Sequence, residues 1–169
     1  MNKKTLDGFS LIEIMVVITI FAVLGIIVTS SIILTLAGTK KSEALIRVRD
    51  NLNYSLAVIE RNVRNANSIP DCPFLASDND RVIRYLDQNG YPASFSCVNP
   101  GSLGSYIASG SAKLTADNIK IMSCSFTCTL SDSITPPLIT IDVTVRDASA
   151  SGVQSAEVSA TTQIYLRNY

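Results

Sequence analysis

The sequence predicts an α+β fold in which a long N-terminal helix, with a transmembrane first half, packs on a C-terminal antiparallel β-sheet. Residues 9–69 contain no proline, and their apolar side chains first form a charge-free run and then recur every 3 or 4 positions, the period of one helix face. After Pro70, short segments alternate between apolar and polar residues, as half-buried antiparallel strands do.

The first half of the predicted helix contains an apolar run, residues 14–39, in which no residue is charged. About 20 apolar residues suffice to span a bilayer as a helix. Glu13 stands at the start of this run, although a carboxylate at the membrane centre costs roughly 2.5–3.5 kcal/mol. Two lysines precede the run and two follow it, so charge alone does not fix its orientation.

Two other interpretations of the same run stay open at this point. One is an ordinary secretory signal cut after Ala37, although the run exceeds the 7–15 residues of a typical signal core. The other is an uncleaved signal anchor. The cut after Ala37 does not explain Glu13, and the signal anchor is the stronger of the two alternatives.

The second half of the predicted helix carries one apolar stripe, and charged side chains occupy its other faces. Pro70 ends the pattern. We therefore expect one helix from about residue 9 to residue 67, about 88 Å long at 1.5 Å per residue. The stripe consists of Leu45, Val48, Leu52, Leu56, Ile59, Val63 and Ala66.

The part after Pro70 predicts a sheet of four or five strands. The Asn-Gly step in the segment 87–90 favours a tight hairpin turn, and a second hairpin loop is expected at residues 147–152. Residues 99–110, rich in Gly and Ser, are expected to be irregular. The expected strands are residues 81–86, 93–98, 118–126, 139–146 and 158–166.

Four cysteines follow the apolar run, namely Cys72, Cys97, Cys124 and Cys128. An even number in a small exported domain predicts two disulfides, and three pairings are possible. We favour Cys72–Cys97 and Cys124–Cys128, the second of which requires a turn between its cysteines, because a straight strand would hold them about 13 Å apart. Buried thiols or a zinc site are alternatives, although no second close pair completes a zinc set.

The composition argues against catalysis and against a nucleic-acid partner. The 169 residues contain 14 Lys and Arg, 14 Asp and Glu, and no His, so the commonest general base and metal ligand is missing. The oxygen-rich segment 77–80 lacks an EF-hand frame and is better explained as a solvated turn. We therefore expect no enzyme, no cofactor and no bound metal.

The hexapeptide Gly8-Phe9-Ser10-Leu11-Ile12-Glu13, with the charge-free run after it, resembles the prepilin signature of type IV pilins and of the pseudopilins of type II secretion. The resemblance implies that prepilin peptidase cuts after Gly8 and methylates Phe9, which becomes the mature N-terminus. It also implies a leader of residues 1–8, a transmembrane and assembly helix of residues 9–39, and an exported pilin-like domain of residues 40–169, whose amphipathic helix covers residues 40–69.

Glu13 then has a physical purpose. Cleavage gives Phe9 a cationic amine about one helical turn away, and in a low-dielectric setting a neighbouring subunit's amine could neutralise this carboxylate. The resemblance implies that this pairing guides subunits into a filament. The other interpretation is a glutamate that reaches the lipid headgroups.

The resemblance also implies partners and a location. The partners are other pilin or pseudopilin subunits, prepilin peptidase, an inner-membrane assembly platform and, before assembly, membrane lipids. The location is the cytoplasmic membrane with the C-terminal domain exported, and then a filament in the periplasm or at the cell surface.

The subtype implied is a minor subunit. Major pilins usually carry a proline in the middle of the apolar segment, where this chain has Thr29, Ser30 and Ser31. Residues 56–66 are similar to the helix end of J-type minor pseudopilins and large minor pilins. A membrane-anchored binding domain or adhesin, in which the sheet recognises a surface, a sugar or DNA, is the alternative function.

Overall fold

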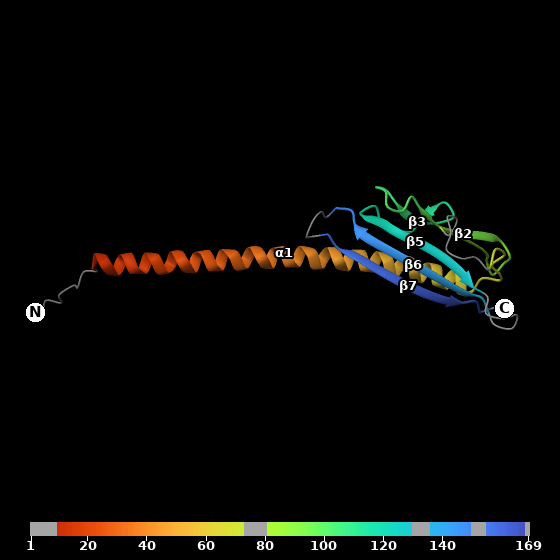
Figure 1. Cartoon of the computed structure of the whole chain (residues 1–169), viewed down its shortest axis with the longest axis horizontal. Coiled ribbons are helices and arrows are strands. Elements are labelled where there is room, and N and C mark those ends of the chain that lie inside the picture. The colour runs from red at the N-terminus through yellow and green to blue at the C-terminus, as the bar shows by residue number, and fades with distance from the viewer. Residues whose placement is uncertain (1–9, 73–80, 130–135, 150–154, 168–169) are drawn as a thin grey trace, which may run out of the picture. The chain divides into compact units, whose positions relative to one another are not determined.

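The computed structural model describes residues 10–72, 81–129, 136–149 and 155–167. The chain divides into two compact units, Met1–Lys40 and Lys41–Tyr169. Within the described residues, one helix is followed along the chain by seven strands (Figure 1). The α+β prediction is therefore confirmed.

The helix α1 spans Leu11–Arg64. The predicted start at Phe9 lies outside the described residues, and the observed end comes earlier than predicted. The backbone N–H of Asn67 donates to the carbonyl of Leu86 at 2.9 Å, and the N–H of Leu86 donates to the carbonyl of Ser68 at 2.9 Å. The chain after Arg64 thus bonds to the end of a strand instead of continuing the helix.

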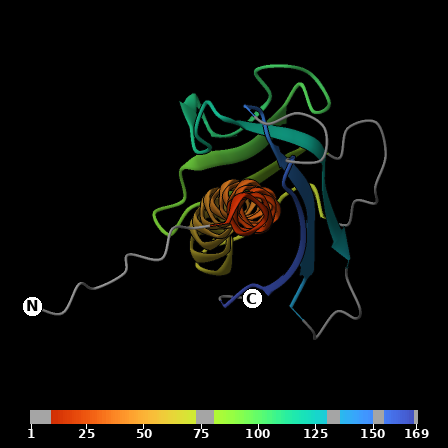
Figure 2. The same cartoon turned by 90° about the vertical axis from the view of Figure 1, so that its left-hand side faces the viewer.

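The second unit contains two antiparallel sheets among its described residues. In Figures 1 and 2 both sheets lie against the part of α1 that belongs to this unit. The first sheet has the order β1-β2-β3-β4 and consists of Val82–Leu86, Pro92–Val98, Tyr106–Ser109 and Ala112–Lys113. The second has the order β5-β6-β7 and consists of Ile119–Thr129, Leu138–Asp147 and Glu157–Tyr165.

The expectation of one sheet of four or five strands was therefore wrong, because the described residues form seven strands in two sheets. Strand β3 and the start of the β3–β4 hairpin arise from a segment that was expected to be irregular, and Ile107 pairs with Cys97 of β2. Gly110, with φ 58°, supplies the backbone conformation that the β3–β4 turn requires. The strand β5 is also longer than expected and runs on to Thr129.

The core of the second unit lies between α1 and the two sheets. Six of the seven stripe residues are buried as predicted, but Leu45 is 42% exposed. Ala44 is buried instead, because it lies four residues before Val48 and therefore on the same face of the helix. The largest fully buried sheet side chains are Ile83, Phe95, Ile107, Ile121, Phe126, Ile139, Ile141 and Ile164.

The turn between β1 and β2 forms at residues 87–90, as predicted. One carboxylate oxygen of Asp87 accepts hydrogen bonds from the backbone N–H groups of Asn89 and Tyr91, both at 2.8 Å. Gly90 has φ 80°, a conformation that an L side chain rarely adopts. The second predicted loop, at residues 147–152, lies partly outside the described residues.

A buried hydroxyl fixes the loop before β3 to strand β5. The N–H of Ile121 donates to Ser105 Oγ at 2.8 Å, and that hydroxyl donates to the Ile121 carbonyl at 3.2 Å. This contact lies beside the irregularity in the β5–β6 register, between Ile121 and Ser123. The loop thereby satisfies backbone groups on the edge of β5 that faces away from β6.

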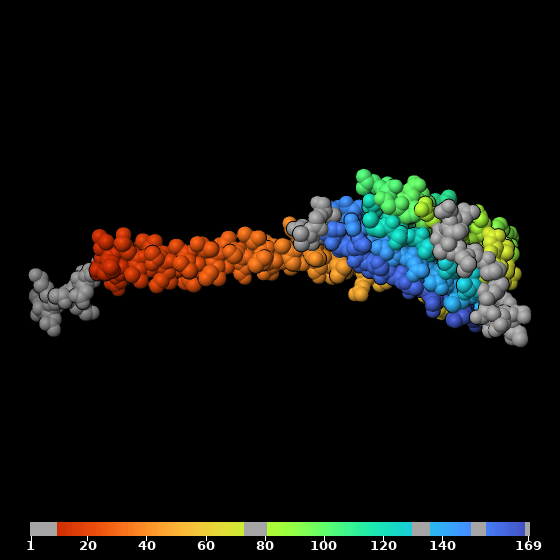
Figure 3. Space-filling model, in the orientation of Figure 1, coloured from red at the N-terminus to blue at the C-terminus, as the bar shows by residue number. Residues whose placement is uncertain are grey.

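The face of the second sheet that points away from α1 is polar, which explains the alternation seen in the sequence. Figure 3 shows this face of β6 and β7 in blue. Its hydroxyls pair across strands: Thr144 Oγ1 and Ser159 Oγ lie 2.9 Å apart, and Thr161 Oγ1 donates to Asp142 Oδ1 at 2.5 Å. Such cross-strand pairs contribute roughly 0.2–1 kcal/mol each.

Candidate functional site

Glu13 lies in the first turn of α1 and is exposed. The carbonyl of Ser10, just before the helix, accepts hydrogen bonds from the N–H groups of Glu13 at 3.0 Å and Ile14 at 3.2 Å. A negative charge in a first helical turn interacts favourably with the helix dipole, by about 0.3–1 kcal/mol at an exposed position. The first turn of α1 is therefore a favourable place for an acidic side chain.

The predicted cleavage residues Gly8 and Phe9 lie outside the described residues. Glu13 is the part of the predicted site that the structure describes. In the sequence it follows Phe9 by four positions, which is about one turn of helix.

The apolar part of α1 that follows Glu13 is long enough and apolar enough to cross a membrane. Its large apolar side chains are exposed throughout. Five of the six hydroxyls in residues 14–39 donate to carbonyls three or four residues earlier in the helix, so these five are satisfied without water. These bonds are Thr19 to Val16, Thr29 to Gly25, Ser30 to Ile26, Thr35 to Ser31 and Thr39 to Leu36.

The four predicted disulfide cysteines form two bonds, but with a pairing different from the one we favoured. Cys72, which follows α1, bonds Cys128 in β5, with their Cα atoms 5.5 Å apart. Cys97 in β2 bonds Cys124 in β5, with their Cα atoms 6.2 Å apart. The first bond fixes the chain after the helix to the second sheet, and the second bond joins the two sheets.

The pairing of Cys124 with Cys128 was wrong because no turn separates them. Both residues lie in β5 and both point toward the core. Four residues of strand span about 13 Å, whereas a disulfide needs Cα atoms about 4.4–6.8 Å apart. With both β5 cysteines facing inward, each finds its partner on a different element of the core.

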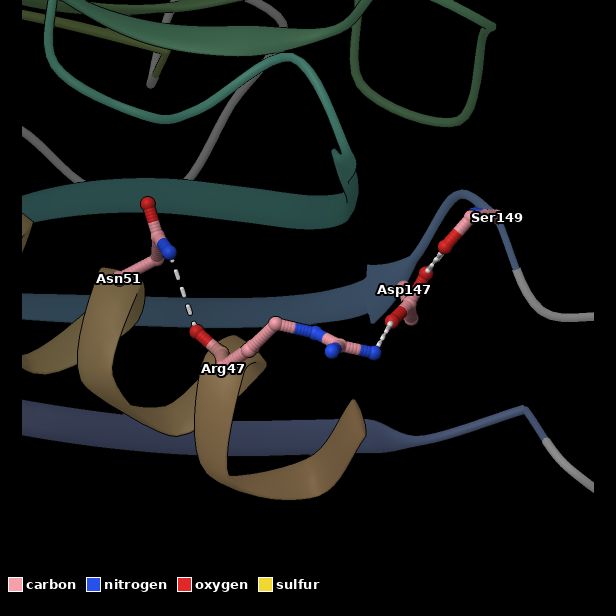
Figure 4. A network of polar contacts seen from close by, with 4 residues as sticks. All are labelled: Arg47, Asn51, Asp147 and Ser149. Atoms are coloured by element: carbon pink, nitrogen blue, oxygen red, sulfur yellow. Dashed lines mark hydrogen bonds and ion pairs between the residues drawn. The ribbon is translucent and has the colours of Figure 1, made fainter. Parts of the chain in front are cut away.

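A polar network connects α1 to the end of β6 and was not predicted from the sequence (Figure 4). The guanidinium of Arg47 lies 3.8 Å from a carboxylate oxygen of Asp147. The side chain of Asp147 is fully buried and that of Arg47 is 52% exposed. The other oxygen of Asp147 accepts hydrogen bonds from the Ser149 N–H at 2.7 Å and from its hydroxyl at 2.5 Å.

Asn51 extends this network toward β5. Its Nδ2 donates to the Arg47 carbonyl at 3.1 Å, one turn earlier, and its Oδ1 accepts from the N–H of Ala116 at 3.2 Å. One side chain therefore links the helix to the segment that precedes β5. In the sequence, Arg47 and Asn51 gave no signal beyond their place on a polar helix face.

Two ionisable groups of the second unit have shifted pKa values. Burial raises the pKa of the Tyr85 hydroxyl above its ordinary value of 10.0, and the negative charge of Asp87 raises it further. A hydrogen bond from Lys113, together with the positive charge of that lysine, lowers the pKa of the exposed Asp117 carboxyl. Among the described residues, no group of three or more His, Cys, Asp or Glu side chains could hold a metal ion.

Comparison with known proteins places the recognisable signal at the N-terminus. Residues 7–29 match the family described as the prokaryotic N-terminal methylation motif, and this range contains Gly8, Phe9 and Glu13. A search of curated proteins and a search of solved structures each returned no match.

Proposed function

We propose that this chain, which carries the class III signal of type IV pilins and pseudopilins at its N-terminus, is a minor subunit of a type IV pilus-like or type II secretion filament. The observation that carries the proposal is the order of three features. The methylation motif covers residues 7–29, Glu13 lies in the first turn of α1, and an exposed charge-free helix follows.

Processing is the first step of the proposed function. Prepilin peptidase cuts between Gly8 and Phe9 and methylates the new amine of Phe9. Methylation of an amine does not remove its charge. The mature end of the helix then carries a cation and, one turn later, the carboxylate of Glu13.

Assembly is the second step. Before it, the apolar part of α1 lies in the cytoplasmic membrane in contact with lipid, and the second unit is exported. During assembly the amine of one subunit pairs with Glu13 of a neighbour, because a charge pair in a low-dielectric setting is attracted far more strongly than in water. The exposed apolar side chains of α1 then pack against the helices of other subunits.

The hydrogen bonds that the hydroxyls make within α1 are compatible with both lipid and the interior of a filament. Each of the five hydroxyls already has an acceptor in its own helix. The helix can therefore move from lipid into a filament without leaving these groups unsatisfied. The inner-membrane assembly platform is the partner expected to carry out this transfer.

A minor rather than a major subunit is favoured by the apolar segment itself. Thr29, Ser30 and Ser31 stand where major pilins usually have a helix-breaking proline. The structure has unbroken helix through these positions, and Ser30 donates to the carbonyl four residues earlier. Residues 56–66, similar to the helix end of J-type minor pseudopilins, support the same subtype.

Mass spectrometry of the mature N-terminus tests the processing step. The chain is purified from cells with and without prepilin peptidase. We expect a mature chain that begins with methylated Phe9 only when the peptidase is present. An intact Met1 in both strains, or a start after Ala37, would reject the proposal in favour of a signal anchor or a secretory signal.

A further inference from the structure

A polar cavity of about 380 Å³ lies in the second unit, between the last turns of α1 and the turn that joins β1 to β2. Its volume falls near the lower end of the range for small-molecule sites, roughly 300–1,000 Å³. Arg61, Asn62 and Asn65 form the helix wall, and residues 87–89 form the opposite wall. Val58 supplies an apolar contact.

The two walls are fixed to each other by backbone hydrogen bonds. Asn67 and Ser68, just after the helix wall, bond Leu86, just before the turn wall, at 2.9 Å in each direction. The turn itself is held by the two hydrogen bonds that the Asp87 carboxylate accepts from the backbone N–H groups of Asn89 and Tyr91. Because these contacts are within the protein, a ligand would not need to order the walls when it binds.

The lining has a high capacity for hydrogen bonds. Four of its side chains are amides, which can each donate and accept. Asn62 and Asn65 each use one N–H to bond a helix carbonyl, at 2.8 and 2.9 Å. Each amide thus keeps a carbonyl oxygen and a second N–H for a ligand. An apolar ligand would desolvate these groups at a cost, so a hydrogen-bonding ligand suits the cavity better.

The charges of the lining balance. Arg61 on the helix wall is the cation, and Asp87 on the turn wall is the anion. The neighbouring Glu60 and Arg64 pair with each other. An anionic ligand would meet the Asp87 carboxylate, and a cationic ligand would meet the guanidinium. A neutral ligand avoids both repulsions.

We propose that this cavity binds a neutral sugar residue, a ligand that presents several hydroxyls and an apolar ring face to the amides and to Val58. The proposal goes beyond the subunit role, and it requires neither cleavage at Gly8 nor assembly. Binding would let a filament subunit, or a membrane-anchored one, contact a neutral glycan.

Saturation-transfer NMR on the full chain in lipid nanodiscs tests this proposal without a filament. The probes are glucose, galactose, N-acetylglucosamine and N-acetylgalactosamine, with glucuronate and inorganic phosphate as anionic comparisons. The variants are Asn62→Ala and Gln88→Ala, which alter exposed side chains of the two walls. Asn53→Ala, an exposed amide of α1 that is not part of the lining, is the matched control.

We expect saturable binding of at least one neutral sugar, weakened about tenfold in each wall variant by the loss of its hydrogen bonds and unchanged in Asn53→Ala. Three results would overturn the proposal. They are no saturable binding of any of the four sugars, equal affinity in the wall variants, and tighter binding of glucuronate or phosphate than of the neutral sugars. Because the test does not involve processing, its failure leaves the subunit role untouched.

Discussion

Arg47 and Asp147 approach within 3.8 Å, although one side chain is half exposed on α1 and the other is fully buried at the end of β6. The pair joins the helix to the second sheet at a point where Asp147 also holds Ser149. Because one partner is exposed, removing that partner should cost less than breaking a fully buried pair. Its main effect is to give the buried carboxylate a cation on the helix.

Substitution of either partner should lower the free energy of unfolding, but by different amounts. Arg47→Ala removes the cation alone and should cost about 1 kcal/mol. Asp147→Ala also removes the acceptor of two hydrogen bonds from Ser149 and should cost about 2–3 kcal/mol. Urea unfolding of the full chain in micelles measures both values. Arg49→Ala, an exposed neighbour on α1, is the control, and an equal effect of Arg49→Ala and Arg47→Ala would contradict this role.

Peptide mapping should recover the two disulfides of the structure, Cys72–Cys128 and Cys97–Cys124. Trypsin alone cannot separate Cys124 from Cys128, because no Lys or Arg lies between residues 120 and 146. A second cut after Phe126 with chymotrypsin separates them. A linked pair of fragments that joins Cys124 to Cys128 would show that the pairing is wrong.

Removal of each disulfide should destabilise the second unit through the unfolded chain. The bonds close segments with sequence separations of 56 and 27 residues. The chain-entropy relation gives about 4 kcal/mol for the longer and about 3.5 kcal/mol for the shorter. Paired Cys→Ser variants, unfolded in urea under identical conditions, check this order. A larger loss from the Cys97–Cys124 pair would contradict it.

Ser105→Ala should also be destabilising, although it removes one atom. The buried Ser105 hydroxyl accepts a hydrogen bond from the N–H of Ile121, and alanine offers that N–H no acceptor. A buried donor left unsatisfied costs about 1–3 kcal/mol. Ser102→Ala, in the same loop but exposed, is the control. Equal urea midpoints for the two variants would refute the importance of this bond.

The raised pKa of the Tyr85 hydroxyl predicts that the protein loses stability at alkaline pH. Its ring stacks on Phe95 with the centroids 5.5 Å apart, and its pKa is raised above 10.0 by burial and then by Asp87. A raised folded-state pKa means that the neutral hydroxyl stabilises the fold below pH 10, and that this contribution is lost as the pH rises through the folded-state pKa.

The matching variant is Tyr85→Phe, which keeps the ring and removes the titrating group. Unfolding free energies measured from pH 8 to about 12 should fall less steeply for this variant than for the wild type. Tyr91→Phe, an exposed tyrosine in the adjacent turn, should follow the wild-type curve. The burial account of the Tyr85 pKa fails if the curve of Tyr85→Phe overlays the wild type.

Local sequence patterns were enough to predict α1, the buried stripe and the turn at residues 87–90. A helix period, a proline and an Asn-Gly step each act over a few residues, so the chain displays them directly. Leu45 was the exception within the stripe. Both Leu45 and Ala44 are apolar and lie three or four positions before Val48, so the apolar period fits either residue. Which of the two residues is buried depends on where the sheets lie against the helix.

Long-range relationships could not be predicted in the same way. The partner of Cys97 lies on another sheet, and the separation of β1–β4 from β5–β7 depends on how both sheets meet α1. Arg47 is an ordinary surface residue until Asp147, distant in sequence, is brought next to it. The local periodicity of the sequence does not indicate which distant residues will lie next to each other. The cavity beside Arg61 depends in the same way on a turn that is distant in the chain.

The role of Glu13 in assembly is the central claim, and its substitution tests that claim most directly. The measurement is the amount of this subunit in sheared filaments, relative to its amount in the membrane, in cells that assemble the filament. Glu13→Ala is compared with the wild type and with Glu43→Ala, an exposed carboxylate elsewhere on α1. Mass spectrometry of the N-terminus confirms that each variant is still cleaved.

We predict that the Glu13→Ala subunit is processed normally but is depleted from filaments by about tenfold or more, as the loss of roughly 1.4 kcal/mol of pairing would produce. The Glu43→Ala subunit should be incorporated like the wild type. Filaments that contain Glu13→Ala at the wild-type level would contradict the pairing of Glu13 with a neighbouring Phe9 amine.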